Sequence, residues 1–497
     1  MNAVTKLTKR ETAKSIFAFL LGIIGIYALI VCMVAVKYGI KGFTGYFGDS
    51  ERPLITVTVA IAILYAILYT FFFFENKSVL AKFGKICELF LIIYISMTLT
   101  FVFSYFVHPM SRPFVFISLM CVTLFRRRDA IFINSTYALM MLVIDRFLGL
   151  PFSEWKDLTI GGITNIEIYQ GYACLLCTFC TGIISASVFT TVKSRFHCII
   201  FAFILFIPIE VINSVIILPL GDFVASKIVD LLIFSAVGCL VSVMLYMFVI
   251  PIFEKLFAEM TVFRLREITS ESVPLIKRLK ENAPGTYSHS VVVSQLVEAC
   301  AKAIGEDPEL ARAAAIYHDV GKLKGPEMFA ENQTEYNFHD DITPELSVDI
   351  IRSHTRNGAE LIRKSRLPDF FADICIQHHG TMPIKYFYYK ALKMSDGELN
   401  IENYSYSGPI PETKIAALIM IADSSEAAVR TLPDRSPARI EEFVRGVIEE
   451  RLDLGQFDNC DITMRELMIV KNTIVSQLSG VYHSRVVYPK ITISKKK

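Results

Sequence analysis

The first half of the chain is dominated by apolar runs that are long enough to cross a lipid bilayer. The hydrocarbon layer is about 30 Å thick, so a crossing helix needs about 20 mostly apolar residues. Six runs clearly meet this requirement, at 16–36, 55–74, 86–107, 171–192, 199–220 and 231–250. Main-chain groups in lipid have no water to bond to, so each run has to form a helix. This half therefore predicts a bundle of membrane-spanning helices.

Two further apolar runs, 115–125 and 131–150, are separated by Arg126, Arg127, Arg128 and Asp129. The run 115–125 is short for a span, so the pair forms either two crossings or one re-entrant hairpin. Both arrangements leave the parity of the count unchanged. We expect two crossings, and therefore about eight spans over residues 16–258, after a cytoplasmic N-terminal segment 1–15.

The basic residues orient these spans, because cytoplasmic loops carry an excess of Lys and Arg. With eight spans and an inside N-terminus, the outside loops are 37–54, 108–114, 151–170 and 221–230. Every dense basic cluster then falls on the inside, namely Lys6, Lys9, Arg10, Lys14, Lys77, Lys82, Lys85, Arg126, Arg127, Arg128, Lys193 and Arg195. The sequence predicts a multi-pass protein of the cell membrane, embedded in lipid, with its C-terminal half in the cytoplasm.

Polar residues inside the predicted spans are few. Glu210 and Asn213 lie three apart on one run, and a carboxyl at that depth is costly without a partner. We favour a protonated Glu210 that is hydrogen-bonded within the bundle over a site that senses a ligand. Cys174, Cys177 and Cys180 recur in an apolar run without polar support, so we interpret them as small core residues rather than as metal ligands.

The second half has the charge density of a soluble domain and repeated signals for helix starts. Asp307-Pro308, Thr343-Pro344 and Ser436-Pro437 each pair a capping residue with proline in the first turn. Residues 414–430 are apolar nearly all round, which predicts a central buried helix. No segment shows the alternation of a strand. The fold class is therefore all-α throughout.

The predicted organisation after the membrane region has three parts. An amphipathic connector helix covers 259–283, a helical domain covers 284–490, and a basic tail covers 491–497. The formal net charge of the whole chain is only +2. A field this weak gives no reason to expect a nucleic acid polymer as partner.

The helical domain carries a set of histidines and aspartates suited to binding metal. Neutral imidazoles and carboxylates are natural ligands for iron, manganese or zinc. Each member lies on a predicted helix or at its end, so a bundle could direct all of them to one place. The set consists of His289, His318, Asp319, His354, His378, His379 and Asp423.

Seven side chains are too many for a single ion that must also keep an open position. If Asp319 bridges two ions, one is completed by His289, His318 and Asp423. The other is completed by His354, His378 and His379. Two cations about 3.5–4 Å apart neutralise phosphate charge and acidify a water molecule for in-line attack.

The motif HDVGK, with a histidine on either side, then HHG and a final aspartate, is similar to the HD-domain phosphohydrolase superfamily. Longer strings narrow the resemblance: APGTYSHS, AIYHDVGKLKGPEMFAENQ, QHHGTMPIKYFYYKA, MIADSSEAAVR and GVYHSRVVYP. They resemble the seven-transmembrane-HD family of bacterial cyclic di-AMP phosphodiesterases over most of residues 251–490. The last seven predicted spans also resemble that family's membrane module.

This resemblance implies hydrolysis of cyclic di-AMP to linear pApA at a centre of two divalent transition-metal ions, iron or manganese. It implies that the seven residues above are the ligands. The expected partners are a cyclic dinucleotide and, as a further candidate, a second copy of the chain in a homodimer.

Several other residues are candidates for contact with the substrate. Lys322, close after the HD pair, resembles a cation that neutralises phosphate, and we expect it to be catalytic together with Asp319. Thr381 either donates to a phosphate oxygen or caps a helix end. Weaker candidates for the second layer or the substrate wall are His339, Arg356, Tyr482 and His483.

The chain departs from the family in one respect. Members of the family typically carry a large extracellular domain between the first two spans, whereas only 37–54 occupy that place here.

The rival functions are a cyclic di-GMP phosphodiesterase of the HD-GYP class and a non-catalytic nucleotide receptor. The first should show Gly-Tyr-Pro after the paired histidines, where this chain has Gly380-Thr381-Met382-Pro383. The second has little reason to keep a complete ligand set.

Overall fold

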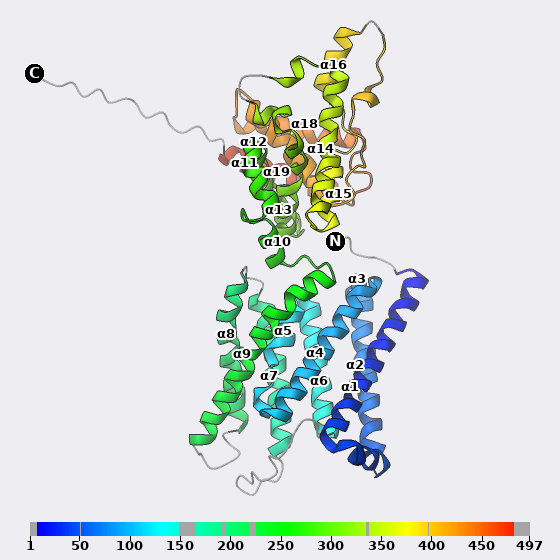
Figure 1. Ribbon diagram of the computed structural model, residues 1–497, viewed down its shortest axis with the longest axis vertical. Helices are drawn as coiled ribbons and strands as arrows, with labels where there is room; N and C mark the ends of the chain where they lie inside the picture. Colours follow the sequence, from blue (N-terminus) through cyan, green and yellow to red (C-terminus); the bar gives the residue numbers. More distant parts are fainter. Residues whose placement is uncertain are drawn as a thin grey trace, which may run out of the picture. The chain divides into compact units, whose positions relative to one another are not determined.

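The computed structural model describes residues 7–49, 51–148, 166–189, 192, 194–217, 225–333, 337–395 and 397–481. Within these ranges all regular elements are helical, and one isolated bridge joins Pro383 and Ser405. The chain divides into two compact units between Phe263 and Arg264 (Figure 1). The all-α prediction is confirmed.

The first unit is a helical bundle. Its elements are α1 (Lys9–Asp49), α2 (Glu51–Glu75), α3 (Lys77–Ala81), α4 (Phe83–Phe106), the 3-10 turn η1 (Pro109–Ser111), α5 (Phe114–Leu124), α6 (Arg127–Leu148), α7 (Ile166–Val188), α8 (Arg195–Ile217) and α9 (Ala225–Leu256). Among the described residues, seven of these helices are long and apolar enough to cross a membrane. Large apolar side chains cover their outer faces, such as Phe74, Phe203 and Phe248, which are 75%, 70% and 75% exposed. A surface of this kind suits lipid and not water.

Two segments of this unit differ in form from the expectation, while the number and orientation of the crossings stay predictions. The run 115–125, which we expected to be one of the eight spans, forms the 11-residue helix α5. This helix is about 17 Å long and too short to cross the hydrocarbon layer by itself. The expected outside loop 37–54 is largely helical, because α1 continues to Asp49 beyond a kink at Gly39, where φ is 70°. The predicted loops 151–170 and 221–230 lie largely outside the described residues.

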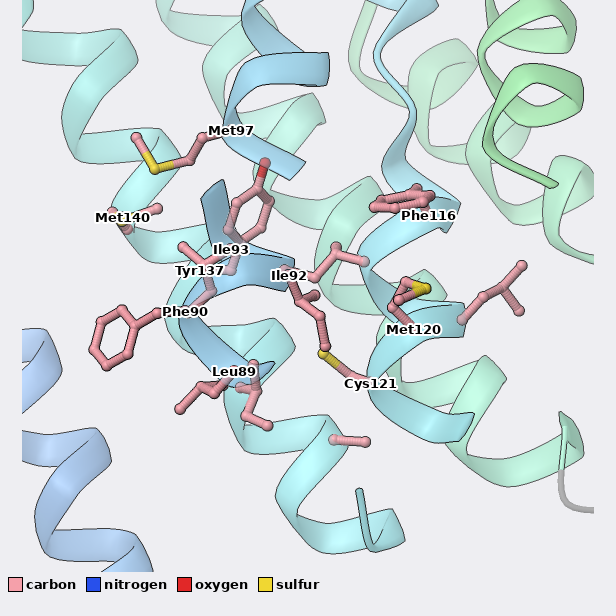
Figure 2. Packing of buried hydrophobic residues seen from close by; sticks show 14 of the residues in the cluster. Leu89, Phe90, Ile92, Ile93, Met97, Phe116, Met120, Cys121, Tyr137 and Met140 are labelled. Atoms are coloured by element: carbon pink, nitrogen blue, oxygen red, sulfur yellow. The ribbon is translucent and has the colours of Figure 1, made fainter. Parts of the chain in front are cut away.

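The short helix α5 is nevertheless deeply packed. Figure 2 shows Phe116, Met120 and Cys121 of α5 near apolar side chains of α4, with Tyr137 and Met140 of α6 close by. Every one of these five side chains is at most 4% exposed. The core of this unit is therefore built around α4, α5 and α6.

A buried ion pair ties the segment before α5 to α6. Arg112 donates two hydrogen bonds to Asp145, at 2.6 and 3.1 Å, and a third to Ser104 Oγ at 2.7 Å. Both charged side chains are 2% exposed. Sequence reasoning had assigned Arg112 to an outside loop. Paired charges satisfy one another here, which is the usual way that a membrane interior tolerates them.

The second unit contains α11 (Pro274–Asn282), α12 (Pro284–Ile304), α13 (Pro308–Tyr317), η5 (Val320–Lys324), η6 (Pro326–Met328), η7 (Ala330–Asn332), η8 (Phe338–Asp340), α14 (Pro344–Lys364), α15 (Asp369–Gln377), α16 (Lys385–Met394), η9 (Ile401–Tyr404), α17 (Lys414–Thr431), α18 (Pro437–Asp453) and α19 (Met464–Val481). The three predicted starts at Pro308, Pro344 and Pro437 are confirmed. Helix α17 is the predicted central one, with twelve buried residues.

The predicted connector helix over 259–283 is wrong in one respect, because this stretch is not a single helix. It contains α10 (Val262–Ile268) and α11, separated by a turn over 269–273. Ala258, just after α9, has a φ of 54°. This left-handed conformation ends a helix, so apolar periodicity was a poor guide to helical continuity here.

Gly321 permits the close approach that brings the HD motif to α14. A Cβ added at Gly321 would lie 1.9 Å from the carbonyl oxygen of His354 and 2.5 Å from the nitrogen of Gly358. Both are main-chain atoms and cannot rotate away. Glycine is the residue that lets two backbones come this close, and the contact sets Asp319 beside His354.

Gly321→Ala should therefore destabilise the second unit and separate Asp319 from His354. Overpacking of this kind costs about 1–3 kcal/mol of unfolding free energy, and more where backbone must move. The matched control is Gly446→Ala on α18, where a new Cβ meets nothing within 4 Å and helix propensity improves by about 1 kcal/mol. Thermal unfolding of both full-length variants tests the contact. Equal melting temperatures would contradict it.

Candidate dinuclear metal centre

Five helices bring the predicted ligands together. His289 lies on α12, His354 lies on α14 and Asp423 lies on α17, whereas the His318-Asp319 and His378-His379 pairs follow the last turns of α13 and α15. All seven side chains meet in two overlapping groups. In each group the ligand atoms lie within 4.8 Å of one another: Asp319, His354, His378 and His379, and His289, His318, Asp319 and Asp423.

Asp319 is shared by both groups, and each of its oxygens faces one of them. Oδ1 lies 3.3 Å from His354 Nε2 and 3.6 Å from His378 Nε2. Oδ2 lies 3.4 Å from His318 Nε2 and 3.9 Å from His289 Nε2. This is the arrangement required of a carboxylate that bridges two cations.

Three of the histidines are oriented by their own helices. The Nδ1 atoms of His318, His354 and His378 lie 2.6, 2.5 and 2.9 Å from the carbonyl oxygens of Ala315, Ile351 and Cys375, each three residues earlier. A proton on Nδ1 donates to that carbonyl, which leaves the Nε2 lone pair directed at the cluster. Metal-binding histidines usually have this second hydrogen bond, because it fixes the tautomer and the ring.

His289 is oriented by a carboxylate that sequence reasoning missed. Its Nδ1 lies 2.5 Å from Glu426 Oε2, while its Nε2 lies 2.9 Å from Asp423 Oδ1. Glu426 is only 2% exposed. A signal for it was available, because Glu426 follows Asp423 by three residues on one helix and therefore shares its face.

Without cations, the cluster leaves buried polar atoms unsatisfied, and this is a reason to expect metal ions there. His318 Nε2 and Asp319 Oδ1 are buried and have no hydrogen-bond partner among the described residues. An unsatisfied buried polar atom costs about 1–3 kcal/mol, and a cation that accepts both lone pairs removes the cost. The His379 side chain is 21% exposed, so a ligand can approach the cluster there.

In the metal-free protein, protons occupy some of these positions. Burial alone would lower the pKa of His289, but hydrogen bonds to Asp423 and Glu426 raise it to about 9. Burial also opposes the charge on His318, yet Asp319 beside it raises the pKa of His318 to about 10. Cations and protons therefore compete for the same lone pairs, and metal affinity falls as the pH is lowered.

Lys322 is held by two carboxylates. Its Nζ donates to Asp319 Oδ2 at 2.7 Å and to Glu331 Oε1 at 2.8 Å, and its side chain is 14% exposed. Burial disfavours its charge, but Asp319 and Glu331 keep its pKa above the ordinary value. Its clearest role here is to balance and hold Asp319, and the expected phosphate contact stays a prediction. Glu331, on η7, was not foreseen.

Thr381 is paired with a buried glutamine. Its N–H donates to Gln456 Oε1 at 3.0 Å, and its hydroxyl accepts from Gln456 Nε2 at 2.8 Å. Gly380 precedes it with a φ of 54°. Of the two roles considered, these contacts favour the structural one, in which Thr381 fixes the chain after His379.

The weaker candidates do not gather at the cluster. The His339 ring contacts Met328 O through Nε2 at 2.7 Å and packs on Phe387. Arg356 lies two residues beyond His354, about 200° around an α-helix, and lines a pocket of about 380 Å³ together with Arg352, Ser353 and Ser407. The expected substrate contacts of His339 and Arg356 stay predictions. Tyr482 and His483 lie outside the described residues.

The comparisons with known proteins agree with this chemistry. Residues 286–428 match the family model described as HD domain. The cyclic-di-AMP phosphodiesterase PgpH of Listeria monocytogenes serotype 1/2a is 46% identical over 242 residues, which cover 48% of this chain and 34% of that protein. PgpH of Bacillus subtilis is 41% identical over 291 residues, which cover 58% of this chain and 41% of that protein.

A solved structure, the L. monocytogenes PgpH HD domain in complex with cyclic di-AMP, is 47% identical, with a TM-score of 0.41. The match covers 43% of this chain and 100% of that one. The two curated PgpH relatives are matched over well under half of their own lengths. Part of the C-terminal unit, residues 286–428, thus matches the HD-domain model, and this unit is similar in sequence to the PgpH phosphodiesterases.

Proposed function

We propose that this protein is a membrane-anchored, metal-dependent phosphodiesterase that hydrolyses cyclic di-AMP to pApA and so controls the level of this second messenger. The observation that carries the proposal is the pair of four-residue groups joined by Asp319. The substrate is inferred from the names of the relatives that share 46% and 41% identity. The membrane anchor is inferred from seven long apolar helices.

The residues of the cluster have distinct roles in this proposal, as ligands of the metal ions or as groups that orient those ligands. His289, His318 and Asp423 would hold one divalent ion, and His354, His378 and His379 the other, with Asp319 between them. A pair of iron or manganese ions would neutralise the phosphodiester charge and acidify a water molecule. Glu426 and three main-chain carbonyls keep the imidazole lone pairs pointing inward.

Lys322 and Glu331 support the bridge. The ammonium of Lys322 lies against Asp319 Oδ2 and prevents this carboxylate from rotating away. Glu331 holds Lys322 from the other side and also accepts a hydrogen bond from Thr286 at 3.0 Å. Because Thr286 begins the helix that carries His289, the bridge and this ligand are positioned together.

The unchelated full-length protein should contain about two transition-metal ions per chain, as two-metal hydrolysis requires. Asp319→Ala should lower the metal content and abolish hydrolysis while leaving helicity nearly intact, because it removes the only side chain shared by both groups. Metal analysis and circular dichroism check this. Asp349→Ala is the control, since this carboxylate is 69% exposed and pairs with Arg352. Full activity in Asp319→Ala would sink the metal hypothesis.

Cyclic di-AMP should be cleaved with at least about tenfold higher kcat/KM than cyclic di-GMP, because adenine and guanine present different donors and acceptors to a binding site. Product analysis should find pApA first. A preference for cyclic di-GMP would favour the HD-GYP alternative. Binding without turnover by the metal-loaded protein would favour a receptor.

The proposed orientation places the C-terminal unit in the cytoplasm. A reporter fused after Lys497 should then be cytoplasmic, and a cysteine introduced at Asp49 should react with an impermeant reagent from outside. A cysteine introduced at Arg127 is the internal control, and labelling of that position from outside would overturn the topology.

A further inference from the structure

Tyr406 covers one side of the candidate metal centre. Its ring is stacked on His379, with centroids 4.2 Å apart and planes inclined by 24°. It also meets His354 edge-on, at 6.1 Å and 87°. Both histidines belong to the same four-residue group. Sequence reasoning missed this tyrosine, because nothing in its local pattern connects it with the histidines.

Main-chain hydrogen bonds fix the position of Tyr406. Its N–H donates to Met382 O at 3.0 Å, and Ile384 N–H donates to Tyr404 O at 2.8 Å. The isolated bridge between Pro383 and Ser405 lies between these bonds. The segment with Tyr406 is thus paired with the segment that follows His378 and His379, so the ring and these ligands are held in one frame.

The Tyr406 ring lies against two members of the cluster, His379 and His354. No described residue forms a hydrogen bond with the hydroxyl, and the side chain is only half-buried. A phenol hydroxyl can donate one hydrogen bond.

We propose that Tyr406 is a catalytic residue whose hydroxyl donates a hydrogen bond to a non-bridging oxygen of the phosphodiester at the cluster. The inference rests on the proposed function. Charge on this oxygen has to be stabilised during in-line attack, and a preorganised donor is an effective way to do so. The ring has a second task, which is to hold His379 in its orientation.

The test uses the full-length, metal-loaded protein and two substrates, cyclic di-AMP and bis(p-nitrophenyl) phosphate. Tyr406→Phe removes the hydroxyl and keeps the stacked ring. We expect kcat/KM to fall by about 10- to 100-fold on both substrates, the range for losing a hydrogen bond to a charged group. Metal content and melting temperature should stay at the values of the unmodified protein.

Tyr404→Phe is the matched control. Tyr404 lies two residues earlier, and its hydroxyl donates to Glu345, which is not a member of the cluster. This variant should keep the kinetics of the unmodified protein. Tyr406→Leu separates the two tasks of Tyr406, because it also removes the ring from His379. It should release metal to a competing chelator more readily than Tyr406→Phe does.

Unchanged kinetics in Tyr406→Phe would overturn the proposal, and so would equal losses in Tyr406→Phe and Tyr404→Phe. Cleavage of the synthetic diester without cleavage of cyclic di-AMP would refute the proposed substrate. The role of Tyr406 would then be decided by the synthetic diester alone, so the two failures can be told apart.

Discussion

The position of the Asp319 carboxylate is the constraint on which the candidate metal centre of the C-terminal unit depends. Its two oxygens face two different sets of imidazoles, and neither set is complete without it. A carboxylate buried to 1% exposure is unfavourable unless positive charge surrounds it. Lys322 provides part of that charge in the metal-free protein, and cations would provide the rest.

Much of the surrounding architecture can be understood as support for this position. The missing side chain at Gly321 allows η5 to touch the backbone of α14. Carbonyl groups within the helices orient three imidazoles, and Glu426 orients a fourth. Each support lies on a packed helix or its end, where side-chain rotamers are restricted. The centre is therefore preorganised by ordinary helix geometry.

The N-terminal unit also contains buried charge, and there two side chains of opposite charge pair with each other. Helix α5 is too short to cross the bilayer by itself, and the segment before it carries the charged side chain of Arg112 into the interior of the bundle. Arg112 and Asp145 form a buried pair there, with Ser104 as a further acceptor. Buried apolar side chains of α4, α5 and α6 pack against one another nearby (Figure 2). Hydropathy along the chain could not distinguish this arrangement from an eighth regular span, because it does not report pairing between distant residues.

The all-helical class, the apolar bundle, several helix starts and the seven residues of the candidate centre could be predicted from the amino-acid sequence. These properties are carried by local features: apolar run length, capping residues followed by proline, and side-chain types that bind metal. The tertiary structure decided which residues support the centre. Glu426 lies 137 residues from His289 along the chain, and Tyr406 joins His379 through a bridge between two separate segments. Contacts of this kind depend on how helices pack in three dimensions. Local spacing places Glu426 on the same helix face as Asp423, but it does not reveal that His289 is its partner, and nothing local marks Tyr406.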